Sequence, residues 1–178
     1  MDSNKRYNSY PVWIVLFSNL VSLGIVALGF LIFLRFSILA SLAYLLYFLF
    51  LEYRLLRFHC PDCFYYGKNC AFGHGRISAL LFKKGDPVKF CAHSMTWKDM
   101  ILDIMISLLP FLAGIILMII EFDYFLLAAT ILILLLTTFG NNIIRGKFAC
   151  RYCSQRDLGC PAEALFNKEK KEYHETAQ

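Results

Sequence analysis

Long apolar runs separated by short polar breaks dominate this chain. Four of them are long enough to span a bilayer: residues 11–34, 37–58, 100–120 and 123–140. The hydrocarbon core of a bilayer is about 30 Å thick, and a helix needs roughly 20 apolar residues to cross it. Hydrophobic residues make up 58% of the chain, above the roughly 45–50% that is usual in soluble domains. The pattern therefore predicts an all-α integral membrane protein with four transmembrane helices.

The polar segments divide the chain into four parts. We expect a first transmembrane hairpin over residues 1–58, a loop rich in cysteine and histidine over 59–99, a second hairpin over 100–140, and a cysteine-rich C-terminal segment over 141–178. The break inside each hairpin is short, and short connections join antiparallel neighbours in helix bundles.

The positions of the cationic residues predict how the helices are oriented in the membrane. Of the 18 Lys and Arg residues, all but Arg35 lie in residues 1–10, 52–99 and 141–178. Cytoplasmic loops of membrane proteins are enriched in Lys and Arg. We therefore expect both termini and the 59–99 loop to lie in the cytoplasm.

The net charge of +5 follows from the same loops, where it suits the anionic head groups of a lipid bilayer. Nucleic acid is not an expected partner, because the chain lacks a soluble basic patch with interleaved aromatic residues. The expected partners are the bilayer and a cytosolic or membrane protein, and the chain can also form an oligomer.

A repeat with a constant offset of 90 residues organises the chain. Adding 90 to the numbers of three cysteines gives the numbers of three others: Cys60, Cys63 and Cys70 correspond to Cys150, Cys153 and Cys160. The same shift takes Gly24 in the first predicted helix to Gly114 in the third. Each half is thus a helix hairpin followed by a C-x2-C-x6-C triad. Because both halves start in the cytoplasm, we expect parallel repeats related by an axis along the membrane normal.

The cysteines are the candidate metal ligands of this protein. All seven lie in segments assigned to the cytoplasm, where thiols are kept reduced and structural disulfides are rare. Duplicated C-x2-C pairs in such a compartment indicate metal sites, since two thiolates two residues apart can face one ion across a tight turn. Zinc in structural sites takes four ligands in a tetrahedron, and each triad supplies three.

Further ligands are available near the first triad, and fewer near the second. Candidates that could complete the first site are His59, His74, Cys91 and His93. The second triad must borrow or share a ligand, leave a position open, or take an oxygen from Asp157 or Glu163. Sharing would require the two triads to meet on the axis of the bundle.

The duplicated spacing resembles the fungal Zn2Cys6 cluster. The segment ACRYCSQRDLGC, residues 149–160, is similar to one half of that motif. The resemblance implies a binuclear zinc cluster in which six thiolates hold two ions and two of them bridge. It covers only the two triads, which are separated here by 79 residues where that family has a short linker, and it implies nothing about DNA binding.

Two other chemistries use the same residues. Thiolates are also the ligands of iron–sulfur clusters, which would make the protein an electron carrier in the membrane. A C-x-x-C pair can instead act as a redox-active dithiol, which would make it an oxidoreductase. We expect structural zinc that builds a scaffold or interaction platform. No phosphate-binding loop, nucleophile elbow or H-E-x-x-H motif points to another enzyme class.

Overall fold

The computed structural model describes residues 6–86, 90 and 97–158. Four helices are long and apolar enough to cross a membrane, over Val12–Leu34, Ile38–Phe58, Ile101–Ile120 and Tyr124–Tyr152. The described residues contain helices and no strands beyond one isolated bridge, between Tyr7 and Cys153. The prediction of an all-α multi-pass membrane protein is therefore confirmed.

The first hairpin consists of α1 (Val12–Leu34) and α2 (Ile38–Phe58). Ser37 ends the connection between them, because its side chain accepts a hydrogen bond from the backbone N–H of Ala40, at 3.1 Å. An N-terminal serine cap of this kind satisfies one of the backbone donors that a helix leaves unpaired at its start.

The second hairpin consists of α5 (Trp97–Ile120) and α6 (Tyr124–Leu135). Asp123 caps α6 by accepting a hydrogen bond from the Phe125 N–H, at 2.9 Å. The helix then continues through a π-helical stretch inside the predicted run, Leu136–Gly140, and a second one beyond its end, Ile143–Ala149. Apolar residues such as Ile144, which is buried, continue past the end of the run, and no proline interrupts them.

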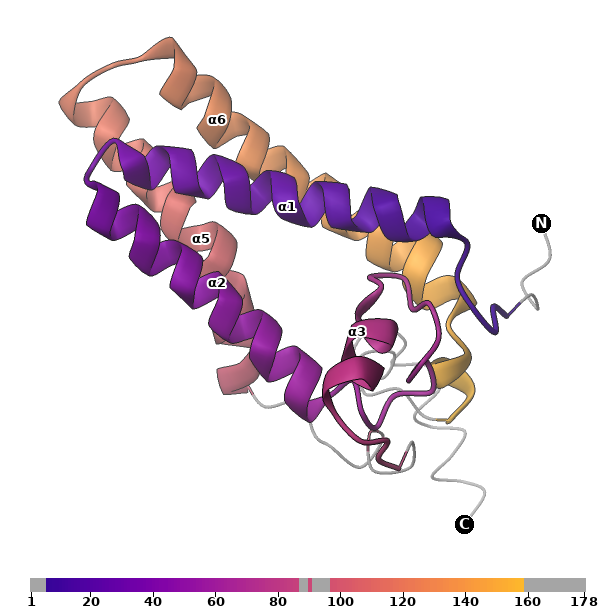
Figure 1. Ribbon diagram of the computed structural model, residues 1–178. Helices are drawn as coiled ribbons and strands as arrows, with labels where there is room; N and C mark the ends of the chain where they lie inside the picture. Colours follow the sequence, from indigo (N-terminus) through magenta and orange to yellow (C-terminus); the bar gives the residue numbers. More distant parts are fainter. Residues whose placement is uncertain (1–5, 87–89, 91–96, 159–178) are drawn as a thin grey trace.

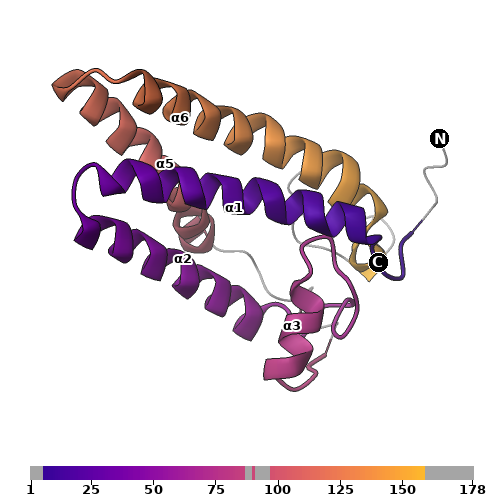
Figure 2. The same cartoon turned by 45° about the horizontal axis from the view of Figure 1, so that its top comes forward.

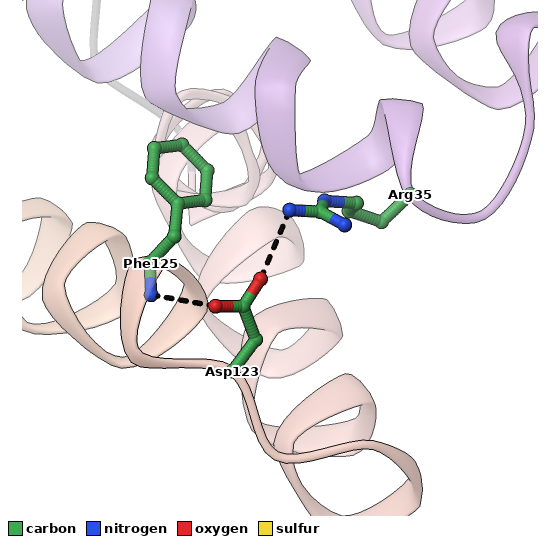
Figure 3. Close-up of polar contacts among 3 residues, drawn as sticks. All are labelled: Arg35, Asp123 and Phe125. Atoms are coloured by element: carbon green, nitrogen blue, oxygen red, sulfur yellow. Dashed lines mark hydrogen bonds and ion pairs between the residues drawn. The ribbon is translucent and has the colours of Figure 1, made fainter.

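Both hairpin turns lie at one end of the bundle, and both cysteine segments lie at the opposite end (Figures 1 and 2). An ion pair joins the turns, with 2.9 Å between Arg35 Nη2 and Asp123 Oδ2 (Figure 3). The Arg35 guanidinium also lies 5.9 Å from the centre of the Phe125 ring. Helix α1 packs against α2, α5 and α6, and so is central to the bundle.

Small residues allow the helices of the bundle to approach closely. A Cβ atom on Gly114 of α5 would collide with the side-chain oxygen of Thr130 on α6. A Cβ atom on Gly24 would meet Leu136 at an ordinary contact distance of 3.6 Å. Close approach of helices at small residues is typical of membrane proteins, and here it applies to Gly114 rather than to Gly24.

The large apolar side chains of the bundle fall into two groups. Buried ones form clusters between the helices, such as Ile32 of α1 against Ala129 and Ile133 of α6. Many others are exposed, including Leu20 on α1 and Ile119 on α5. Exposed aliphatic side chains along a helix suit contact with lipid tails rather than water.

Candidate metal centre

The first cysteine segment follows α2 directly and folds into consecutive turns. The N–H of Cys63 donates to the Cys60 carbonyl at 3.3 Å, and the N–H of Tyr66 donates to the Cys63 carbonyl at 3.0 Å. The N–H of Gly73 donates to the carbonyl of Cys70, also at 3.0 Å. Gly73 has a φ of +78°, which glycine adopts at little cost, and short helix α3 (His74–Leu81) begins after it.

The second cysteine segment repeats the first two of these turns. The N–H of Cys153 donates to the Cys150 carbonyl at 3.3 Å, and the N–H of Arg156 donates to the Cys153 carbonyl at 3.2 Å. These three residues, Cys150, Cys153 and Arg156, correspond, at the offset of 90, to Cys60, Cys63 and Tyr66 of the first segment. The same spacing therefore gives the same local backbone hydrogen bonds in both halves.

Two reciprocal hydrogen bonds join the cysteine segments. The N–H of Phe64 donates to Gln155 Oε1 at 2.8 Å, and the N–H of Ser154 donates to the Tyr65 hydroxyl at 2.9 Å. Phe64 corresponds to Ser154 in the repeat, and Tyr65 corresponds to Gln155. In each bond, the donor is the backbone N–H of the residue directly after one C-x2-C pair. The acceptor is the side chain of the second residue after the C-x2-C pair of the other half.

The side chains at this junction are almost fully buried, with 2% of the surface of both Tyr65 and Gln155 exposed. The Tyr65 hydroxyl also donates to the Tyr7 carbonyl at 2.7 Å. Tyr10 lies beside it, with 5.3 Å between the ring centres of Tyr10 and Tyr65, and its hydroxyl donates to the Ala149 carbonyl. The residues before α1 thus bridge the two cysteine segments.

Cysteines from both triads contact this core. Cys63 and Cys70 of the first triad and Cys153 of the second all pack against the buried cluster that contains Tyr10 and Tyr65. Burial raises the pKa of the Tyr10 hydroxyl well above its usual value, and the nearby Cys153 raises it further. The Tyr65 pKa is also raised, mainly by burial. Both hydroxyls keep their protons and donate them to backbone carbonyls.

Five of the six repeat cysteines lie in the described part of the chain. Cys60, Cys63, Cys70 and Cys153 are half-buried, Cys150 is exposed, and all five are free of disulfides. Burial, followed by the proximity of Cys70, Cys63 and Glu52, raises the pKa of the Cys60 thiol to about 12. The remaining predicted ligands Cys160, Cys91 and His93 lie outside the described residues.

The described side chains do not by themselves form a metal site. Among residues 6–86, 90 and 97–158, no three His, Cys, Asp or Glu side chains form a group that could hold a metal ion. The donor type is nevertheless suitable, because thiolates are preferred ligands of zinc and iron–sulfur clusters. The structure brings together two cysteine turns that have matching backbone hydrogen bonds. Both turns pack against the buried cluster that contains Tyr10 and Tyr65.

The two histidines of the first segment have different surroundings. His59 follows α2, and its N–H donates to the Leu55 carbonyl at 3.1 Å. His74 Nε2 lies 2.8 Å from Glu52 Oε2, and its ring stacks on Phe72 with 6.2 Å between ring centres. A carboxylate that holds one ring nitrogen of a histidine is the usual arrangement behind a metal-bound imidazole. Glu52 is thus positioned to orient the His74 ring beside the first triad.

Glu52 and His74 also line a half-open cavity of about 220 Å³ between α1, α2 and α3. Its other polar residues are Asn19 and Ser22 of α1. The Asn19 side chain donates to the Val15 and Phe72 carbonyls, at 2.8 and 3.2 Å, and so ties α1 to the segment that leads into α3.

Reasoning from the sequence did not assign Tyr7, Tyr10 or Gln155 to the candidate metal centre. A signal for Gln155 exists in the repeat, because this residue occupies the position that corresponds to Tyr65. No comparable signal exists for Tyr7 and Tyr10, which precede the first helix and lie far along the chain from both triads.

Comparison with known proteins adds no assignment: no family model, no curated protein and no solved structure matches this chain.

Proposed function

We propose that this protein is a multi-pass membrane scaffold whose two cysteine triads form a structural zinc centre on the cytoplasmic side. The observation that carries the proposal is the reciprocal pair of hydrogen bonds that joins the two C-x2-C turns through Tyr65 and Gln155. A zinc centre at this junction would fasten the ends of both hairpins. Its binding free energy would then contribute directly to the folding of the two segments.

The proposal includes a pseudo-two-fold relation between the halves. Three features support it: the constant offset of 90 residues, the matching turns at Cys60 and Cys150, and the exchange of partners at Phe64 and Ser154. A two-fold axis along the membrane normal exchanges equivalent residues in this reciprocal way. The excess of Lys and Arg in the cysteine segments supports their cytoplasmic location.

The ligands of the proposed centre are the six repeat cysteines, with further ligands from Cys91, His59, His93 or His74. Zinc binds thiolates, so each cysteine must lose its proton on binding. The low polarity around Cys60, which raises its pKa, makes a bare thiolate unfavourable there. A bound cation would reverse this preference, because it stabilises the coordinated thiolate.

A scaffold role follows from the chemistry of structural zinc. The metal has no redox activity, and a closed tetrahedral site leaves no position for a substrate. The two cysteine segments and α3 would instead form one rigid surface at the membrane, onto which a cytosolic or membrane protein can dock.

The test is elemental analysis together with a visible spectrum of protein purified without oxygen. We expect about two zinc ions per chain and a colourless solution. Iron with matching sulfide and a visible absorption band would replace the scaffold with an electron carrier. Protein that contains no metal would leave dithiol chemistry as the function of the triads.

The Cys150→Ser/Cys153→Ser variant distinguishes a shared centre from two separate sites. In a shared cluster the variant loses all of its zinc, whereas two separate sites would leave one ion bound by the first triad. Cys91→Ser in the otherwise unchanged protein is the companion variant, and loss of metal from it would identify Cys91 as a ligand.

A further inference from the structure

Helix α3 exposes apolar side chains on the outside of the protein. Its buried face is made of small residues, among them Gly75 and Ser78. Its outer face carries Ile77, Leu80 and Leu81, and 85% of the surface of Leu80 is exposed. Adjacent exposed aliphatic residues on a polar, solvated segment indicate contact with a protein or a membrane.

The contacts of α3 place it at the level of one membrane surface. The Ser78 hydroxyl donates to the Leu56 carbonyl near the end of α2, at 3.3 Å. Phe82, which follows α3, lies 6.2 Å from the Tyr53 ring and 5.2 Å from the Arg57 guanidinium. Tyrosine and arginine at the end of a transmembrane helix mark the head-group region. In Figures 1 and 2, α3 lies beside the end of α2 that is far from the hairpin turn.

Exposed cationic residues precede and follow the apolar residues of α3 in the sequence. Arg57, Arg76, Lys83 and Lys84 are all exposed. Three carboxylates lie at the two ends of this segment: Asp86 itself, Asp62, whose Oδ1 accepts the Asp86 N–H at 2.9 Å, and Glu52, which pairs with His74. Aliphatic side chains flanked by Lys and Arg are typical of a segment that lies in a head-group layer containing anionic lipid.

The apolar surface of α3 is also continuous with the lipid-facing surface of α2. Leu46, Phe50, Tyr53 and Arg57 follow one another at helical spacing and are all exposed, and the last two contact Phe82. A lipid whose acyl chains contact this face of α2 therefore has its head group beside α3.

We propose that residues 74–84 form an interfacial anchor that binds anionic phospholipid head groups. Leu80 and Leu81 insert among the upper parts of the acyl chains, while Arg76, Lys83 and Lys84 bind the lipid phosphates. The anchor holds the first cysteine segment at the membrane surface. It does not depend on the identity, or on the presence, of a metal at the cysteines.

The test uses a tryptophan at position 80 in single-copy nanodiscs. Leu80→Trp is introduced together with Trp13→Phe and Trp97→Phe, and the discs contain lipid brominated near the head group, with or without phosphatidylglycerol. We expect strong quenching by the brominated lipid, weak quenching by aqueous acrylamide, and at least about threefold stronger lipid quenching in anionic discs. One copy per disc removes a second chain as the covering partner.

Charge variants test the lipid preference. Arg76→Gln/Lys83→Gln/Lys84→Gln should abolish the dependence on anionic lipid. The matched variant Arg145→Gln/Lys147→Gln/Arg151→Gln removes the same charge from exposed positions elsewhere and should retain it. Strong quenching of the tryptophan at position 80 by acrylamide without quenching by lipid would overturn the proposal. Equal quenching by lipid in neutral and anionic discs would overturn it as well.

A second measurement uses the chain without substitutions. Photoactivatable anionic lipid with its reactive group near the phosphate should label peptides that contain residues 76–84, and the label should be several-fold weaker when the lipid is zwitterionic. Labelling confined to the long helices would overturn the proposal as well.

Discussion

Arg35 and Asp123 lie 88 residues apart in the sequence, yet their side chains form an ion pair with 2.9 Å between nitrogen and oxygen (Figure 3). The pair joins the two hairpin turns at the end of the bundle opposite the cysteines. Asp123 has a second role, since its other oxygen accepts the Phe125 N–H at the start of α6. The two roles can be separated by substitution.

We predict that Asp123→Ala lowers stability more than Asp123→Asn. Alanine removes both the ion pair and the helix cap, and the loss of a cap costs about 1 kcal/mol. Asparagine retains the cap and removes only the charge. The ion pair is worth about 0–1 kcal/mol, because 54% of the Arg35 side chain is exposed and exposed pairs are screened by water. Thermal unfolding in detergent, with Arg35→Ala and the double variant as controls, measures each part. Equal losses for the alanine and asparagine variants would contradict this assignment.

We predict that Tyr65→Phe loosens the junction between the cysteine segments. The Tyr65 hydroxyl accepts the Ser154 N–H and donates to the Tyr7 carbonyl. Its removal leaves the half-buried Ser154 N–H without its acceptor, whereas the Tyr7 carbonyl keeps the Ser154 hydroxyl as a donor, at 2.9 Å. The loss of such a partner costs about 1–3 kcal/mol. Hydrogen exchange at the Ser154 amide should accelerate, and the unfolding temperature should fall.

Tyr66→Phe is the matched control for this prediction. Its hydroxyl makes one described hydrogen bond, to the Phe82 carbonyl at 2.7 Å, and that bond does not cross between the halves. The Ser154 amide should exchange at an unchanged rate in this variant. Similar exchange rates in the Tyr65 and Tyr66 variants would show that the hydroxyl does not hold the junction.

We predict that Cys60 reacts slowly with alkylating reagents in reduced, metal-free protein. Burial and its cysteine neighbours raise its pKa from 9.0 to about 12, which lowers the thiolate fraction at pH 8 by about 1,000-fold, and the thiolate is the reacting form. Mass-spectrometric mapping should find Cys150, which is exposed, labelled well before Cys60. Both should react quickly once the chain is denatured. Equal rates in the folded protein would exclude the buried environment of Cys60.

The same pKa shift predicts how stability depends on pH. Above about pH 9 the unfolded chain loses the Cys60 proton while the folded chain keeps it. Ionisation therefore stabilises the unfolded state and not the folded state, and the free energy of unfolding falls. The contribution of the neutral Cys60 thiol to the free energy of unfolding is complete below about pH 9 and declines as the pH rises toward 12. Cys60→Ser should reduce this decline in the metal-free protein.

We predict that Gly75→Ala is destabilising and that Gly146→Ala is not. A Cβ atom on Gly75 would collide with the Tyr65 carbonyl and lie 2.6 Å from the Lys68 carbonyl. Both obstacles are backbone atoms, so the first cysteine segment must shift, at a cost of about 1–3 kcal/mol. A Cβ atom on Gly146 meets nothing within 4 Å, and alanine is the better helix former. Thermal unfolding of both variants checks this, and a neutral Gly75→Ala would contradict the close approach.

The sequence by itself determined the four membrane-spanning helices. A run of apolar residues must satisfy its backbone hydrogen bonds internally when it enters lipid, and a helix does so using only contiguous residues. The turns at Cys60 and Cys150 are determined in the same way, because each is closed by a hydrogen bond between residues three apart. Properties that depend on neighbouring residues can be predicted from their order along the chain.

The tertiary structure decided which distant residues meet. The contacts of Tyr65 with Ser154 and of Tyr10 with Ala149 join segments 89 and 139 residues apart, and the pairing of His74 with Glu52 depends on how α3 packs against α2. Hydrophobicity drives burial without direction, so it does not specify which polar groups are brought together. That selection comes from the packing of α1 against α2, α5 and α6, which sets the positions of both cysteine segments relative to each other.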